Sequence, residues 1–484
     1  MSKSIYIFLI FSIIISAAII LFWGLGNVDL DGNEDIYVSD SVGYLRHDPF
    51  MAPRQHLRKP HYPASPHPFF TQLLTAEVFR LFGLSLYTAR LTQAIATFIT
   101  ICTTMLLAWI LFRSPYTVIA VGLIVTTLPL SIRYGRMAVL DPVLMCEQTL
   151  GMLWVYLATR SAKQRGYLFT ILTGIALGLS ISTKLTGIFF FVPLTLWFMW
   201  QYIQEKNSYF LKAFALLIVS ASFTFILFTD PYSYVYGWTH FSDPKYKNIS
   251  LLGTLMSFTK LQYWYYFIIS LTGVIPFLLL LFAVYCTHNP FKNPRWIFIL
   301  LWILGPLIYL FINPPHVTGL SSEWAYLPLV PPLALILGMA LTKISTYFKQ
   351  KFKIPQLILY GLYTVLITPN LINYGLRFQP MPLSNYIKAR NVINGNLAVL
   401  KVIQTLNLDT QPVTALLVIR GVDVPVWLLN SNITTEPKYH ELDFYNYVIT
   451  DNTELVKQVL SHHFQVAVKL KNPSEPAIVL LRRE

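Results

Sequence analysis

Long runs of apolar residues recur along the chain from the N-terminus to about residue 372. A helix needs about 17 to 25 mostly apolar residues to cross the hydrocarbon core of a bilayer. By this measure the pattern predicts about 11 transmembrane helices. The first run also has features of a signal peptide, but it is long, and we expect it to remain as the first helix. The predicted segments are 5–23, 88–112, 116–131, 143–158, 167–183, 186–203, 211–229, 263–285, 296–312, 325–342 and 355–372.

Two regions depart from this apolar pattern. Residues 24–87 form a long connection rich in acidic, histidine, proline and tyrosine residues, and an amphipathic run at 71–82 predicts a short helix in the membrane interface. Residues 373–484 are less hydropathic and alternate short strand-like runs with a helical pattern at 453–462. We therefore predict a transmembrane domain over 1–372 and a small α/β domain over 373–484. The strand-like runs are 413–419, 424–429, 445–450, 464–470 and 477–481.

Composition and charge agree with a membrane protein. Hydrophobic residues make up 55% of the chain and charged residues only 12%, whereas about a quarter of a soluble domain is charged. The net charge of +14 arises largely from Lys and Arg on alternate connections, which predicts a cytoplasmic N-terminus and needs no nucleic-acid partner. An odd number of spans then places the C-terminal domain outside the cytoplasm. The plasma (inner) membrane of a prokaryote is the expected location.

The first candidate for chemistry is an acidic pair, Glu34 and Asp35, just after the first predicted helix and close to Tyr37. In a helix or turn at this place, one carboxylate would point inward and act as a general base, since partial desolvation raises a carboxyl pKa toward working pH. The alternative is that both acids are solvated loop residues. The sequence alone leaves both interpretations open.

A second candidate lies in the short loop that carries Arg133, Arg136 and Asp141. A charge next to a membrane span is costly and is functional by default. If residues 133–141 are helical, the two arginines share a face and bind a phosphate, while Asp141 orients them. An ordinary interfacial ion pair is the competing interpretation, and we favour the functional one.

Lys184 interrupts two long apolar runs, beside small Ser, Thr and Gly residues. A lysine at this depth either extends its ammonium group to the lipid headgroups or binds the phosphate of an anionic lipid. Both interpretations remain. His67, held in a proline-rich stretch, is a weaker candidate for a phosphate or metal contact, and Glu323 and Tyr326 are polar candidates at the mouth of the ninth and tenth spans. No cofactor is indicated with certainty, and a divalent metal is left open.

Five sequence features, some of them described above, occur one after another along the chain. They are an acidic pair and tyrosine at 34–37, a proline-rich stretch at 65–69, the segment 82–91, an Arg-to-Asp loop at 136–141 and a Gly-to-Lys segment at 178–184. The ordered set resembles the polytopic glycosyltransferases that use a lipid-phosphate sugar, namely the protein O-mannosyltransferases and the bacterial aminoarabinose transferases that modify lipid A. The resemblance implies an α-helical polytopic membrane protein with the GT-C fold.

The resemblance also implies an activity. A polyprenyl-phosphate sugar donor would enter from the membrane lipid, and an acceptor protein, lipid or glycan from the outer aqueous side. The acid after the first helix is the proposed catalytic base of such enzymes; it corresponds to Asp35, or to Glu34 if the pair is shifted by one residue. The acid that opens the fourth helix corresponds to Asp141. We expect a hexosyl- or pentosyltransferase that inverts the anomeric centre.

The donor phosphate needs cations, and Lys184, Arg133, Arg136 and His67 are the candidates. Tyr37, Glu323 and Tyr326 are assigned to the acceptor or the cavity. The main alternative is a transporter or flippase of lipid-linked saccharides, in which related halves with paired broken helices are expected. The sequence shows no such duplication.

Overall fold

The computed structural model describes most of the helical part of the chain and the strands near its C-terminus. Contacts within the chain divide it into two compact units. The first unit comprises residues 1–25, 66–71 and 90–378, and the second comprises 26–65, 72–89 and 379–484. The described residues are 3–26, 32–45, 69–229, 293–312, 320–370, 414–418, 432–434, 447–450, 460, 464–470 and 478–483.

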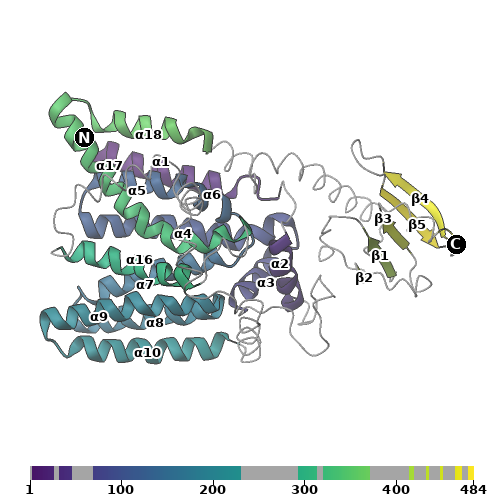
Figure 1. The fold of residues 1–484 in the computed structure, drawn as a ribbon, viewed down its shortest axis with the longest axis horizontal. Helices are drawn as coiled ribbons and strands as arrows, with labels where there is room; N and C mark the ends of the chain where they lie inside the picture. Colours follow the sequence, from purple (N-terminus) through teal and green to yellow (C-terminus); the bar gives the residue numbers. More distant parts are fainter. Residues whose placement is uncertain are drawn as a thin grey trace. The chain divides into compact units, whose positions relative to one another are not determined.

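The first unit is a bundle of long apolar helices that run roughly alongside one another (Figure 1). Its core consists of α7 packed on α8, α8 on α10, and α17 on α5. The helices are α1 (Lys3–Phe22), α4 (Leu86–Phe112), α5 (Pro115–Thr127), α6 (Pro129–Tyr134), α7 (Asp141–Ala158), α8 (Lys163–Thr183), η2 (Leu185–Phe190), α9 (Phe191–Glu205), α10 (Tyr209–Phe228), α16 (Pro294–Ile312), η5 (Leu320–Leu329), α17 (Val330–Phe352) and α18 (Gln356–Asn370).

Six described helices are long and apolar enough to cross a membrane, judged by length and composition. Three shorter apolar helices accompany them. Each predicted span overlaps a described helix, except 263–285, which lies outside the described residues. The six helices are Ser4–Phe22, Leu86–Phe112, Lys163–Thr183, Leu185–Glu205, Tyr209–Phe228 and Ala325–Phe352.

The prediction of one continuous span over 116–131 is wrong, because the chain forms two helices there. Helix α5 ends before Leu128, whose backbone is extended with φ −60° and ψ 127°. Proline disfavours the helical conformation in the residue that precedes it, and Pro129 follows Leu128 directly. The proline then serves as a favourable first residue for α6.

Two helices lie in the region between α1 and α4. Helix α2 (Gly32–Leu45) carries the acidic pair, and α3 (Phe70–Phe82) coincides with the predicted amphipathic helix at 71–82. Helix α3 is followed by Gly83, whose φ of +80° is a conformation that glycine adopts without strain.

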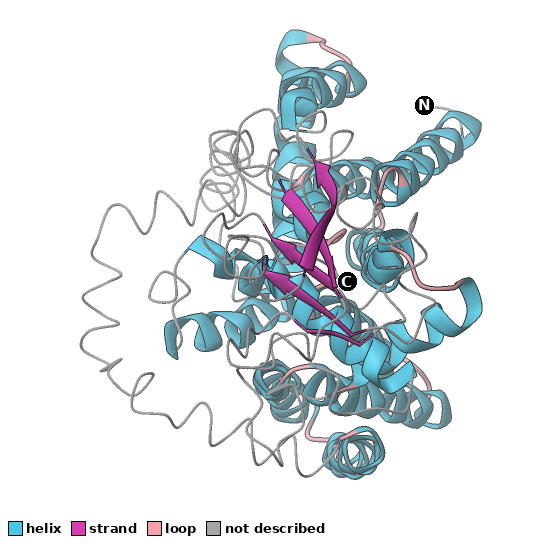
Figure 2. Ribbon diagram, turned by 90° about the vertical axis from the view of Figure 1, so that its right-hand side faces the viewer, coloured by secondary structure: helices cyan, strands magenta, loops and turns pink. Residues whose placement is uncertain are grey.

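The strands near the C-terminus form one mixed sheet in the order β2-β1-β3-β5-β4 (Figure 2, magenta). Strand β1 pairs in parallel with β2 and β3, whereas β5 pairs antiparallel with β3 and β4. Four predicted strands overlap β1, β3, β4 and β5, and β2 was not predicted. The predicted strand 424–429 lies outside the described residues, as does the helix 453–462 apart from residue 460. The strands are β1 (Thr414–Val418), β2 (Asn432–Thr434), β3 (Tyr447–Thr450), β4 (Phe464–Leu470) and β5 (Ile478–Arg483).

Glycines allow α8 and α10 to pack closely. Gly174 and Gly178 are four residues apart and lie on one face of α8. A Cβ atom at Gly178 would lie 2.6 Å from the carbonyl oxygen of Ala221 on α10, and one at Gly174 would lie 2.6 Å from that of Leu217. Small residues at such spacing let two helix backbones approach in a membrane. This contact holds α8 in place along its length.

We expect Gly178→Ala to destabilise the protein by about 1–3 kcal/mol, because the added methyl group forces two backbones apart. Gly361→Ala on α18 is the matched control, since a Cβ there meets no atom within 4 Å. That control should leave stability unchanged or raise it by up to about 1 kcal/mol through helix propensity. Thermal unfolding of both variants in detergent checks the prediction, and equal melting temperatures would contradict it.

Candidate active site

Helices α7 and α8 bring two charged residues together. The connection between them, residues 159–162, is short, so the helices form an antiparallel hairpin. The first residue of α7, Asp141, and the residue that follows α8, Lys184, are therefore at the same end of the hairpin. The structure thus joins two of the residues singled out in the sequence.

Asp141 and Lys184 form a buried ion pair. The Nζ atom of Lys184 donates to both carboxylate oxygens of Asp141, at 2.9 and 3.0 Å. The two side chains are only 9% and 3% exposed, for Lys184 and Asp141 respectively. Desolvating two charges is costly, and their attraction compensates only when the geometry is good. The pairing also shows that Lys184 does not extend its ammonium group to solvent.

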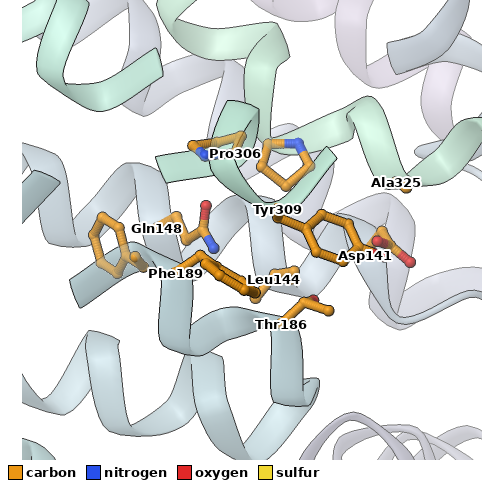
Figure 3. A pocket seen from close by; sticks show the side chains of 10 residues that line it. Asp141, Leu144, Gln148, Thr186, Phe189, Pro306, Tyr309 and Ala325 are labelled. Carbon is orange, nitrogen blue, oxygen red and sulfur yellow. The ribbon is translucent and has the colours of Figure 1, made fainter. Parts of the chain in front are cut away.

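A pocket lies beside this ion pair, and Asp141 lines it. The space that it encloses is small, about enough for one water molecule. In Figure 3 the carboxylate of Asp141 and the amide of Gln148 lie toward opposite ends of the labelled side chains. The walls combine these polar groups with apolar and aromatic surface. The lining residues are Asp141, Leu144, Gln148, Thr186, Phe189, Phe190, Pro306, Tyr309, Ala325 and Pro328.

Helix periodicity explains why α7 contributes three of the lining residues. Asp141, Leu144 and Gln148 are spaced by three and four residues and so share one face. Gln148 is buried, and its Oε1 atom has no hydrogen-bond partner among the described residues. A buried amide oxygen without a partner is costly. The wall of the pocket therefore contains a buried polar group whose oxygen has no partner among the described residues.

Residues 133–141 do not form a helix, so the condition for the two arginines to share a helix face is not met. Helix α6 ends at Tyr134, and turns lead from there to Asp141, so Arg133 and Arg136 do not share a helix face. The Arg133 guanidinium lies 4.8 Å from the centre of the Tyr134 ring. A single helix cannot run from α6 through Pro142, because this proline has no backbone N–H and its ring would clash with the preceding turn.

Arg136 is buried and contacts the end of α1. Its Nη2 atom donates to the carbonyl oxygen of Trp23, and Nη1 of Arg90 donates to that of Leu25 at 2.8 Å. Carbonyl groups at a helix C-terminus lack partners within the helix, and cations there are favourable. Burial, together with the positive charge of Arg90, lowers the pKa of Arg136 to about 10. These arginines thus hold the point where the chain leaves α1.

The acidic pair lies in the first turn of α2, in the second unit. Glu34 is fully buried, whereas the side chain of Asp35 lies outside the described residues. Tyr37 is half-buried on the same helix. Of the remaining candidates, Tyr326 is buried in η5, and His67 and the side chain of Glu323 lie outside the described residues.

Two buried charged residues inside predicted membrane spans were not selected in the sequence analysis. Glu147 lies inside α7 and accepts a hydrogen bond from Thr183, and Arg90 lies in α4. A charge within an apolar span is a signal of function or of a specific structural role. That signal was present in the sequence for both residues, but periodicity gives no information about their partners.

Comparison with solved structures defines the fold. ArnT from Cupriavidus metallidurans in the apo state matches with a TM-score of 0.62 at 14% identity, covering 97% of each chain. The same protein bound to undecaprenyl phosphate matches with a TM-score of 0.60 at 14% identity, covering 99% of this chain and 98% of that one. The Archaeoglobus fulgidus oligosaccharyltransferase matches with a TM-score of 0.57 at 12% identity, covering 97% and 72%. The protein is therefore a multi-pass membrane protein with the GT-C fold.

The amino-acid sequence also matches a family model. Residues 11–289, more than half of the chain, match the family Dolichyl-phosphate-mannose-protein mannosyltransferase. The chain belongs to this family, and thus to the polyprenyl-phosphate-dependent glycosyltransferases of the GT-C type. No curated protein sequence matches the chain closely enough to count as a relative. These findings confirm the family resemblance and the fold class expected from the sequence.

We expect Asp141→Leu and Lys184→Met each to destabilise the protein by about 3–5 kcal/mol, because either change leaves one buried charge without its partner. The double variant should recover much of that loss, since no isolated charge remains. Thermal unfolding of the single and double variants measures this coupling. The exposed pair Glu77–Arg80 on α3 is the control, where removing either charge should change stability by about 1 kcal/mol or less. Additive losses in the Asp141–Lys184 cycle would contradict the prediction.

Proposed function

We propose that the protein transfers a sugar from a polyprenyl-phosphate donor to an acceptor hydroxyl, with inversion of the anomeric centre. The observation that carries the proposal is the buried Asp141–Lys184 ion pair at the edge of a pocket lined by aromatic and apolar residues. An intramembrane cation held by an acid is suited to an anionic lipid headgroup. The class of reaction, sugar transfer from a lipid phosphate, is inferred from the mannosyltransferase family to which the chain belongs.

The proposed reaction is a direct displacement. A base takes the proton of the acceptor hydroxyl, whose oxygen forms a bond to the anomeric carbon. The bond from that carbon to the phosphate oxygen breaks, and the electron pair leaves with polyprenyl phosphate. The phosphate is a good leaving group when cations stabilise its charge. The protein therefore has to supply one base and a small number of positive charges.

We assign the base to Asp35 or Glu34 and the main phosphate contact to Lys184. Asp141 holds Lys184 in place before the donor binds, through two hydrogen bonds of 2.9 and 3.0 Å. Arg133, Arg136 and His67 are further candidates for the phosphate. Arg136 also donates to Trp23, so its contribution would be combined with a structural role.

The residues around the pocket suit the headgroup end of a ligand that is charged there and apolar beyond it. Leu144, Phe189 and Pro306 provide apolar surface for the first part of a lipid carrier, and Tyr309 provides an aromatic ring beside them. Small-molecule sites generally combine such walls with a few placed polar groups. ArnT from Cupriavidus metallidurans was solved with undecaprenyl phosphate, a carrier of the class proposed here.

The proposal extends to acceptor and location. Tyr37, Glu323 and Tyr326 are assigned to the acceptor side of the site, and the acceptor is a protein, lipid or glycan hydroxyl. The site and the domain over 373–484 are placed on the outer side of the plasma (inner) membrane, as the Lys and Arg distribution of the sequence indicates.

The test is a transfer assay with a polyprenyl-phosphate sugar and purified variants. Replacing the base, by Asp35→Asn or Glu34→Gln, should lower kcat by about a hundredfold to ten-thousandfold with little change in donor KM. Lys184→Gln should weaken donor binding and raise donor KM. Lys163→Gln, at the exposed opposite end of α8, is the control and should leave both constants unchanged.

Unchanged transfer in both acid variants would overturn the assignment of the base. Unchanged donor KM in Lys184→Gln would overturn the phosphate site. Movement of an intact lipid-linked saccharide across a vesicle membrane, without sugar transfer, would favour a flippase instead.

A further inference from the structure

A second carboxylate of α7 contacts the end of α8. Oε1 of Glu147 accepts a hydrogen bond of 2.8 Å from Oγ1 of Thr183, and both side chains are buried. Thr183 is the last residue of α8 and directly precedes Lys184. The contact therefore acts on the residue adjacent to the proposed phosphate ligand.

Helix α7 holds the end of α8 at two consecutive residues. Asp141 binds Lys184, and Glu147 binds Thr183. The two acids are six residues apart, which corresponds to about 9 Å along the helix axis. Two bonds separated by that distance constrain both the position and the direction of the chain at this point, which a single ion pair does not.

Neighbouring contacts also restrain the chain at the end of α8. Oγ of Ser182 lies 2.8 Å from Oγ1 of Thr229, beyond the end of α10. The backbone of Lys184 is extended, with φ −156° and ψ 135°, and its carbonyl accepts from the Gly187 N–H at 2.7 Å. The chain thus leaves the helix at Lys184. The position of the last helical residue, Thr183, therefore determines the position of the Lys184 Cα atom, from which the side chain extends.

We propose that Glu147 is a positioning residue that holds Lys184 in place for a lipid phosphate, acting through the hydroxyl of Thr183. The inference rests on the proposed function, in which Lys184 binds the donor phosphate. Without the Glu147–Thr183 bond, the end of α8 is less constrained. The ammonium group of Lys184 is then positioned less well to contact the incoming phosphate while it remains paired with Asp141.

The experiment measures binding of two probes to the purified full-length chain in lipid nanodiscs. The probes are undecaprenyl phosphate and undecaprenol, which lacks the phosphate. Glu147→Leu removes the acceptor, and Thr183→Val removes the donor with little change in shape. Each should weaken undecaprenyl phosphate binding on the order of tenfold, as expected for loss of a hydrogen bond to a carboxylate. Binding of undecaprenol should not change, because it makes no phosphate contact.

Three further variants make the result specific. The double variant Glu147→Leu/Thr183→Val should bind as weakly as either single variant, because both remove the same bond. Glu147→Gln keeps an acceptor oxygen and should bind within about twofold of the unchanged protein. Thr173→Val on α8 removes a buried hydroxyl that bonds only to its own helix, at the Phe169 carbonyl, and should have no effect.

The outcomes separate this inference from the function on which it rests. Unchanged phosphate binding in Thr183→Val, or equal losses for both probes in Glu147→Leu, would overturn the positioning role. If Lys184→Met also leaves undecaprenyl phosphate binding unchanged, the proposed phosphate site itself fails. If Lys184→Met loses binding while Thr183→Val does not, only the role of Glu147 fails. Thr183→Val keeps the test decisive should Glu147→Leu not fold.

Discussion

A charged side chain inside an apolar helix bundle needs an ionic or hydrogen-bonding partner, and the Asp141–Lys184 ion pair meets this requirement where α7 begins and α8 ends. Water is largely excluded from the pair, so neither charge is screened and neither is stable alone. The arrangement depends on the short turn between α7 and α8, which makes them antiparallel. The close contact of α8 with α10 through Gly174 and Gly178 then holds the hairpin against the bundle.

The same demand for partners explains other features of the bundle. Backbone carbonyls beyond the end of α1 have no helical partners, and Arg90 and Arg136 donate to two of them. Within the bundle, Glu147 is hydrogen-bonded to Thr183 rather than to a cation. Each of these buried polar contacts lies at or near a helix end. Several buried charged groups of the described bundle are thus concentrated at or near helix ends.

This concentration of polar groups suits the chemistry of a lipid-linked donor. Such a donor has an apolar chain, which needs an apolar wall, and a charged phosphate, which needs cations. The pocket beside Asp141 combines aromatic and apolar residues with polar groups. A cation already paired with an acid is held in place before the donor arrives, so less ordering is needed on binding. In the proposed function, Asp141 and Glu147 act on the donor through Lys184.

Hydrophobic periodicity and the order of motifs were enough to predict most of the described helices, most of the described strands and the family, because apolar run length and residue type are local properties of the chain. The membrane fold and the overlap of the predicted spans with the described helices follow from that local signal. The break at Leu128 and Pro129 was also readable in principle from the proline, although a single span was predicted there.

The partners of the charged residues were decided by the tertiary structure. Asp141 and Lys184 were both singled out in the sequence, but their ion pair joins residues that meet only when α7 and α8 fold back on each other. Arg136, which is proposed to bind a phosphate, also contacts the chain beyond α1, and Glu147 was overlooked because its partner Thr183 belongs to another helix. Pairing depends on how helices pack in three dimensions, and the spacing of residues along one chain does not contain that information.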